Sequence, residues 1–131
     1  MTDTMPRLFR LNLEVGDIDE AARFYNELFA SETRPDMGAR FYLQAGEVTL
    51  QVVQAEPPHP AAKALYFAVG ELGEVHRRAS ELGCLSAETV HGTPGGEMMV
   101  RPWGERSFYA DDPWGNPLCF VEEGTIYGSQ A

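Results

Sequence analysis

Side chains that could hold a small molecule recur at alternate positions of the strands that this sequence predicts. A guanidinium can bind an anionic or carbonyl group, amides and carboxylates can direct hydrogen bonds, and aromatic rings offer flat stacking surfaces. A few such groups among apolar area are typical of a ligand pocket. The candidate ligand-binding residues are Arg10, Asn12, Glu14, Gln51, Tyr66, Met99, Trp103 and Cys119. The sequence assigns no catalytic residue among them.

Two of these candidates also have plain structural interpretations. Arg10 could pair with Glu14 or another inward carboxylate instead of a ligand, and the sequence leaves both interpretations open. Cys119 is better explained as a small buried apolar residue than as a nucleophile, because no histidine is predicted beside it. Proton transfer by Arg10, Glu14 or Tyr66 also stays open, as does a partner-binding domain with no ligand in its cleft.

The elements that position these residues occur twice. Residues 11–17 read LNLEVGD and residues 65–71 read LYFAVGE, 54 positions later, and the likeness continues into the segments that follow. A repeat of this length is a supersecondary unit. It predicts a single α+β domain, residues 1–131, of two βαβββ modules that form curved mixed sheets around a central cleft, with helices outside. Module one covers about 8–54, a proline-rich linker 55–63, module two about 64–122 and a tail 123–131.

Periodicity places the individual elements. The strand 8–15 alternates, with Phe9, Leu11, Leu13 and Val15 expected under a helix. Asp17 and Glu20 resemble a capping box before a helix at 18–29, and Gly83 ends a second helix at 72–82. Further strands are expected at 39–44, 47–54, 86–91, 97–101, 106–111 and 117–122. Turns are expected at 35–38, 45–46 and 112–116, the last at the floor or rim of the cavity.

Composition excludes several classes of partner. The formal charge of −10 and a pI near 4.6 argue against nucleic acid and anionic membranes, which select clustered lysine and arginine. The acidic surface could attract a cationic ligand, although charge kept for solubility is the favoured explanation. No apolar run approaches the ~20 residues of a membrane span. Two cysteines in no CxxC pattern are expected to be reduced, so a soluble cytoplasmic protein is predicted.

Several motifs together carry a family resemblance. They are the V-G-D-I step at 15–18, Phe24-Tyr25 in the helix after it, P-W-G-E-R-S-F at 102–108 and D-P-W-G-N at 112–116. With the repeat, they resemble the vicinal oxygen chelate superfamily, which contains glyoxalase I, extradiol dioxygenases, fosfomycin-resistance enzymes and bleomycin resistance proteins. The resemblance covers residues 8–122. It implies a site between the two modules, where enzymes of the superfamily hold a divalent metal through His, Glu or Gln.

The positions that match these metal ligands carry unsuitable residues. Counted from the V-G-[DE] steps, the first-strand positions are Arg10 and Ala64, and neither offers a lone pair. The last-strand positions are near Gln51 and at Cys119, a poor pair for a divalent ion. Three histidines lie in three different elements: His59 in the linker, His76 on a helix and expected at the surface, and His91 near a strand end. No metal or other cofactor is therefore expected.

The resemblance then implies a particular function. A chain without the metal ligands resembles the bleomycin resistance proteins, which bind a small organic molecule without transforming it. That class pairs two chains to build two grooves, so a homodimer is implied. The alternative is a metal-dependent lyase, isomerase or dioxygenase of the same superfamily, and the sequence does not identify the ligand.

Overall fold

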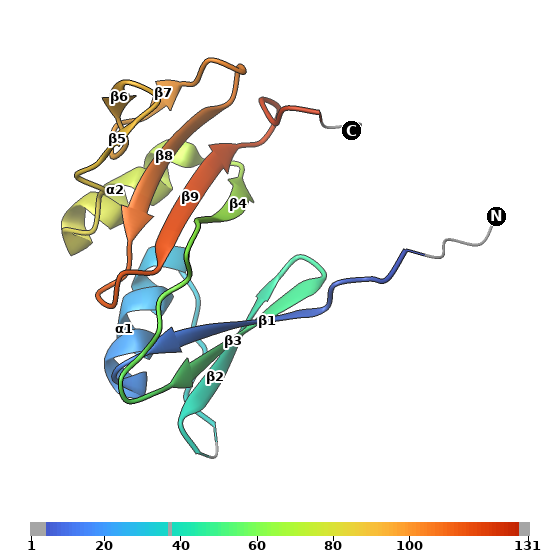
Figure 1. Cartoon of the computed structure of the whole chain (residues 1–131), viewed down its shortest axis with the longest axis vertical. Coiled ribbons are helices and arrows are strands. Elements are labelled where there is room, and N and C mark those ends of the chain that lie inside the picture. The colour runs from blue at the N-terminus through green and yellow to red at the C-terminus, as the bar shows by residue number, and fades with distance from the viewer. Residues whose placement is uncertain (1–4, 37, 129–131) are drawn as a thin grey trace.

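The fold was taken from a computed structural model, which describes residues 5–36 and 38–128. It is a mixed α+β structure with two main sheets and two helices (Figure 1). Residue 37 of the predicted turn 35–38 and residues 129–131 of the predicted tail lie outside the described residues. No helix among the described residues is long and apolar enough to cross a membrane.

The first sheet, sheet A, has the strand order β1-β3-β2. β1 runs parallel to β3, and β2 runs antiparallel to β3. The strands are β1 (Arg10–Val15), β2 (Arg40–Ala45) and β3 (Val48–Gln54), and α1 (Ile18–Phe29) packs against their apolar face. The expected hairpin between β2 and β3 is confirmed, since Ala45 pairs with Val48 across the turn.

The second sheet, sheet B, has the order β4-β9-β8-β7. β4 runs parallel to β9, as β1 does to β3, so the two sheets repeat one connection. The strands are β4 (Leu65–Val69), β7 (Met99–Val100), β8 (Arg106–Asp111) and β9 (Pro117–Glu122), with α2 (Leu72–Leu82) packed on β8 and β9. A separate hairpin joins β5 (Thr89–Val90) to β6 (Thr93–Pro94).

Both helices have the bounds that the sequence predicts. Asp17 caps α1, since its Oδ1 accepts a hydrogen bond from the Glu20 amide at 2.9 Å. A second contact comes from sheet A, where Gln54 Oε1 accepts from the amide of Ile18 at 2.8 Å. Gly83 ends α2 with φ of +70°, a conformation that glycine adopts without a steric penalty.

The segment between α2 and β8 differs most from expectation. The strands predicted at 86–91 and 97–101 shorten to β5 and β7, and β6 was not predicted. The backbone packs closely in this segment, where a Cβ on Gly96 would lie 2.6 Å from the carbonyl oxygen of Ser86. The prediction for Phe9 was also wrong, because Phe9 precedes β1 and is 52% exposed instead of packing under α1.

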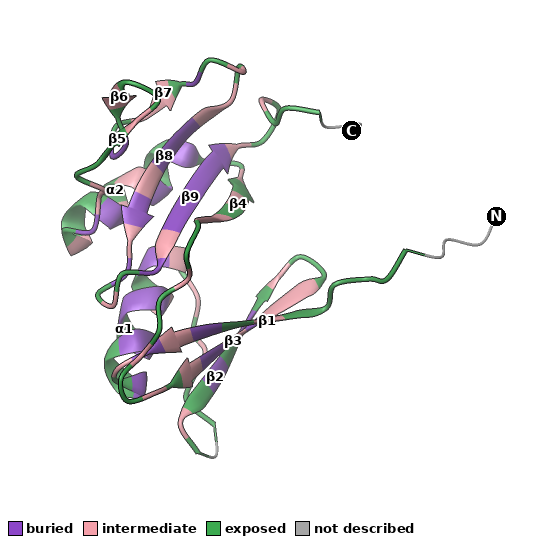
Figure 2. Ribbon diagram, in the orientation of Figure 1, coloured by how far each residue is buried: buried purple, intermediate pink, exposed green. Residues whose placement is uncertain are grey.

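One apolar core joins the two sheets through the helices. Phe29, near the end of α1, contacts Phe67 on β4 and Phe120 on β9, with ring centroids 5.1 and 5.9 Å apart. Figure 2 shows the burial concentrated on the helices, β8 and β9, whereas much of β1 and β2 is exposed. The helices therefore hold the modules together. The face of each sheet opposite its helix is not part of this core.

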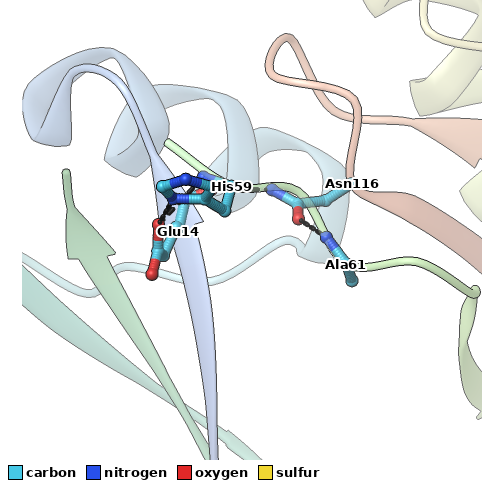
Figure 3. Close-up of polar contacts among 4 residues, drawn as sticks. All are labelled: Glu14, His59, Ala61 and Asn116. Carbon is cyan, nitrogen blue, oxygen red and sulfur yellow. Dashed lines mark hydrogen bonds and ion pairs between the residues drawn. The ribbon is translucent and has the colours of Figure 1, made fainter. Parts of the chain in front are cut away.

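The D-P-W-G-N turn at 112–116 fastens one module to the other. Asp112 and Asn116 are both buried. Asp112 Oδ2 accepts from the Tyr25 hydroxyl of α1 at 2.7 Å, and Asn116 Nδ2 donates to the Glu14 carbonyl oxygen of β1 at 2.9 Å. Asn116 Oδ1 accepts from the amide of Ala61 in the linker (Figure 3). This turn was expected at a cavity floor or rim, but its buried polar groups join the modules.

Candidate functional site

The outer face of sheet A, opposite α1, presents a grid of mostly polar side chains. The strand registers place three rows of three residues side by side on it. The rows, each running from β1 through β3 to β2, are Arg10, Thr49 and Gln44; Asn12, Gln51 and Tyr42; and Glu14, Val53 and Arg40. Five of these nine residues are exposed and the other four are half-buried. Four predicted ligand-binding residues thus share one open face.

Gln51 stands at the centre of this grid and is held by its neighbours. Its Nε2 donates to Asn12 Oδ1 at 2.6 Å, which fixes the orientation of both amides. The guanidinium of Arg40 approaches Gln51 Oε1 with Nη1 at 3.5 Å, the long limit of a hydrogen bond. The amide donors of Asn12 bond to no other described residue, so the centre can bind a polar ligand.

Glu14 is bound to the linker instead of to an arginine of its own face. Its Oε1 accepts from the main-chain amide of His59 at 2.9 Å and lies 3.3 Å from the His59 ring Nδ1 (Figure 3). The His59 amide, and then its ring, lower the pKa of the Glu14 carboxyl below its ordinary value. The suggested ion pair between Arg10 and Glu14 is not formed, and the Arg10 guanidinium lies 5.1 Å above the Phe9 ring.

The corresponding face of sheet B is mainly aromatic and apolar. One row across β4, β9 and β8 consists of Tyr66, Cys119 and Tyr109. The two tyrosine hydroxyls lie 3.3 Å apart and cover the thiol between them. Burial raises the pKa of the Cys119 thiol to about 11, so it stays protonated at neutral pH. Cys119 is completely buried in this chain and supplies apolar floor, not a group exposed to solvent.

Tyr66 and Trp103 meet in a hollow of about 440 Å³ on this face. Val121 forms part of its lining, and the Trp103 indole N–H donates to Glu105 Oε1 at 2.8 Å. Met99 is half-buried on the edge strand β7, opposite Ser107. The second group of predicted residues is therefore collected on sheet B, and Tyr66 and Trp103 are the two that line a hollow.

Arg101 is the residue on this face that sequence reasoning missed. It is 2% exposed, and its guanidinium donates to the hydroxyls of Ser107 and Thr93 at 3.0 and 2.9 Å. It also donates to the carbonyl oxygens of Gly95, Glu97 and Ser107. The arginine binds the 93–97 loop to β8, and nothing in its local sequence distinguishes it from a surface arginine.

A further cavity of about 600 Å³ lies between the modules, beside the end of α1 and the edge of β4. Its walls are mainly apolar, with Phe29, Phe67 and Phe120 among them, and Arg78 at its border donates through Nε to the carbonyl oxygen of Leu28. This space adjoins Tyr66 but contains no sheet A residue from the candidate group. In the described part of the chain, no side-chain hydrogen bond joins the sheet A candidates to the sheet B candidates.

His76 and His91 contact other residues of the fold. The His76 ring Nε2 lies 2.9 Å from the carbonyl oxygen of Gly96, and its ring meets Phe108 edge to face with centroids 4.9 Å apart, so it is half-buried and not the surface residue expected. His91 has φ of +50° and packs its ring against Trp103. No group of three or more His, Cys, Asp or Glu able to hold a metal ion occurs in the described ranges.

The architecture and motifs are those of a known family. The family model described as the Glyoxalase/Bleomycin resistance protein/Dioxygenase superfamily matches residues 7–120. The chain belongs to this superfamily. Solved structures of this superfamily are similar to this chain over nearly its whole length. No curated protein matches this chain significantly.

Three solved structures illustrate the range of this superfamily. The oxidase ChaP-H1 is 26% identical, with a TM-score of 0.76 over 95% of this chain and 100% of that one. A lactoylglutathione lyase from Agrobacterium tumefaciens is 21% identical, with a TM-score of 0.67 over 97% and 100%. The fosfomycin resistance protein FosX from Listeria monocytogenes is 16% identical, with a TM-score of 0.69 over 91% and 94%. The last two similarities show the fold alone.

The divalent metal that this superfamily implies does not fit the corresponding residues. Arg10 presents a cation, Ala64 has no donor atom, and the Cys119 thiol is buried with its pKa near 11. Gln51 alone is a common type of ligand, and its amide is already hydrogen-bonded to Asn12. One neutral amide does not make a site for a divalent ion.

Proposed function

We propose that this protein binds a small organic molecule without a metal and sequesters a drug or metabolite. The observation that carries the proposal is the oriented Asn12 and Gln51 amide pair at the centre of an open sheet face, where related enzymes would need a metal ligand. The aromatic hollow of Tyr66 and Trp103 supports it, because a flat ring could be stacked there.

The ligand site would be completed in a homodimer. In one chain the polar grid and the aromatic hollow belong to different sheets, and both face away from the core. Apolar surface beside them is open, since Phe9 is 52%, Tyr66 60% and Tyr127 73% exposed. A two-fold pairing would bring the grid of one copy against the hollow of the other and close two equivalent sites. A cytoplasmic location is consistent with two buried cysteines that form no disulfide.

Native mass spectrometry of protein purified without chelators tests the oligomeric state, the metal content and the presence of an organic ligand in one measurement. A dimer that carries an organic adduct and no metal is the expected result. Titration with aromatic and cationic compounds should then change the fluorescence of Trp103, recorded in a Trp114→Phe background so that one indole reports.

The Gln51→Ala change should weaken that binding at least tenfold, because it removes the central amide. Arg23→Ala, on the exposed side of α1, is the control and should bind as the parent does. Absence of binding across a broad panel would contradict the proposed function. Equal binding by the Gln51→Ala variant would move the site away from sheet A.

The second candidate is an enzyme of the same superfamily, which the similarity to the oxidase ChaP-H1 favours. A stoichiometric divalent ion in the purified protein, or conversion of a bound aromatic compound that depends on added metal, would establish it. Either result would overturn the metal-free proposal.

A further inference from the structure

Arg40 is the cation directed toward the centre of the sheet A grid. It lies on β2, beside Val53 and diagonal to Gln51 in the strand register. Its Nη1 stands 3.5 Å from Gln51 Oε1, whereas the Arg10 guanidinium is turned back over Phe9. From the sequence, Arg10 was the candidate for holding an anionic or carbonyl group, with an ion pair to a carboxylate as the open alternative, but the geometry favours Arg40 as the anion-binding group.

Arg40 forms no ion pair with a carboxylate among the described residues. None of the ion pairs between described residues involves it, although the protein carries twice as many acidic as basic side chains. The acidic residue in its row of the grid is Glu14, and the carboxylate of Glu14 is held by the amide and ring of His59. The linker thus binds the carboxylate that could otherwise pair with Arg40 across β3.

The groups next to Arg40 suit a planar oxyanion. A guanidinium presents paired N–H groups that match the two oxygens of a carboxylate. The Asn12 amide nitrogen belongs to the same face of the sheet. It is not bonded to Gln51, because Gln51 donates only to the Asn12 oxygen. Tyr42, 38% exposed, stands in the same row as these amides and offers an aromatic surface beside the bound group.

We propose that Arg40, with the amide nitrogen of Asn12, binds a carboxylate of the organic ligand. This inference rests on the proposed function and names the chemical class of its ligand. It differs from the possibility, raised by the net charge of −10, that the acidic surface attracts a cationic ligand. A local guanidinium that forms no ion pair with a described residue decides recognition at contact distance, whereas the charge of distant surface groups is screened within about 8 Å at physiological salt.

The experiment compares aromatic and aliphatic monocarboxylates with their own primary amides, such as 2-naphthoate with 2-naphthamide. Binding is followed by NMR chemical shifts of the Arg40 and Gln51 side-chain N–H groups and by Trp103 fluorescence. The acids should bind at least tenfold more tightly than the matched amides, because only the acid forms charge-assisted bonds.

Three arginine variants complete the test. Arg40→Ala should bring the acid to the affinity of its amide, and Arg40→Lys should restore part of the difference, since lysine keeps the charge without the fork. Arg23→Ala should change nothing. Both positions are exposed, so folding is not at risk.

Two results would overturn this inference. One is equal binding of acids and amides, or an acid affinity that Arg40→Ala leaves unchanged. The other is binding of only neutral or cationic compounds from the wider panel, which would reject the carboxylate while leaving the proposed binding function intact. If no compound of any charge binds, the proposed function fails together with this inference.

Discussion

The outer faces of sheet A and sheet B occupy equivalent places in a repeated strand-helix unit, yet they have opposite chemical character. On sheet A, Asn12 and Gln51 are hydrogen-bonded to each other and open to solvent. At the position 54 residues after Asn12, sheet B has Tyr66, which covers the buried Cys119. Repetition of the backbone therefore fixed where side chains point, but not their chemical character, since Asn12 and Tyr66 are both exposed.

The two sheets also differ in what adjoins them. Residues 89–101 form the β5–β6 hairpin and the edge strand β7, which pairs with β8, and the Arg101 guanidinium binds this segment to β8. In the described part of sheet A, no comparable segment crosses the outer face. One module thus presents a mainly apolar outer face and the other a mainly polar one.

The largest expected effect concerns Arg101, which binds the 93–97 loop to β8 of sheet B. Arg101→Met keeps the apolar volume but removes every donor, leaving the carbonyl oxygens of Gly95, Glu97 and Ser107 without this partner. We expect the free energy of unfolding to fall by about 3 kcal/mol or more. Arg40→Met, on the open face, should cost less than about 0.5 kcal/mol. Urea unfolding followed by circular dichroism measures both, and equal losses would show that the two faces do not differ in this way.

The second prediction uses a matched pair of asparagines. Asn116 is completely buried and bonds the linker, Asp112 and the Glu14 main chain, so Asn116→Ala should lower the free energy of unfolding by about 2 to 3 kcal/mol. Asn12→Ala, whose partner Gln51 can turn to water, should cost under about 1 kcal/mol. A cost for Asn12→Ala as large as that for Asn116→Ala would mean that the sheet A grid is a structural network.

A third prediction concerns the thiols and pH. Burial raises the pKa of both Cys119 and Cys84 to about 11, above the ordinary value of 9.0. Because the folded pKa values are raised, their stabilising contribution is complete below pH 9 and is lost as the pH rises from 9 to about 11, where only the unfolded chain ionises. The urea midpoint should fall over this interval, and the fall should be smaller in a Cys84→Ala, Cys119→Ala double variant. An equal fall in that variant would assign it to other groups.

The smallest effect is expected at Glu14. The His59 amide, followed by its ring, lowers the pKa of this carboxyl, so its midpoint in NMR titration should lie below 4.5. The associated stability is present above the ordinary pKa and is lost as the pH falls through the folded value. His59→Ala removes the ring but keeps the main-chain amide, and should move the midpoint only part of the way back. A midpoint unchanged from the ordinary value in the parent protein would contradict the contact.

Much of the fold could be read from local sequence. The bounds of α1 and α2, the strands 106–111 and 117–122 and the cap at Asp17 were predicted and are confirmed. The signals for these elements are periodic apolar residues, a capping side chain and Gly83, and each acts within a few residues. The segment 86–101 was predicted less well, because its path depends on Arg101 and on glycines packed against other parts of the chain.

By itself, the sequence determined the repeat, its strand and helix order and the alternation that puts Arg10, Asn12 and Glu14 on one face, because side-chain direction follows from backbone period. The tertiary structure decided which face is covered, that Glu14 binds His59, 45 residues away, and that Asn116 reaches the Glu14 main chain across 102 residues. It also decided that Arg40 is directed toward Gln51 while Arg101 is buried. These contacts join elements far apart in the chain. A local sequence pattern cannot predict which distant side chain or main-chain group will lie close enough to bind a given charged residue.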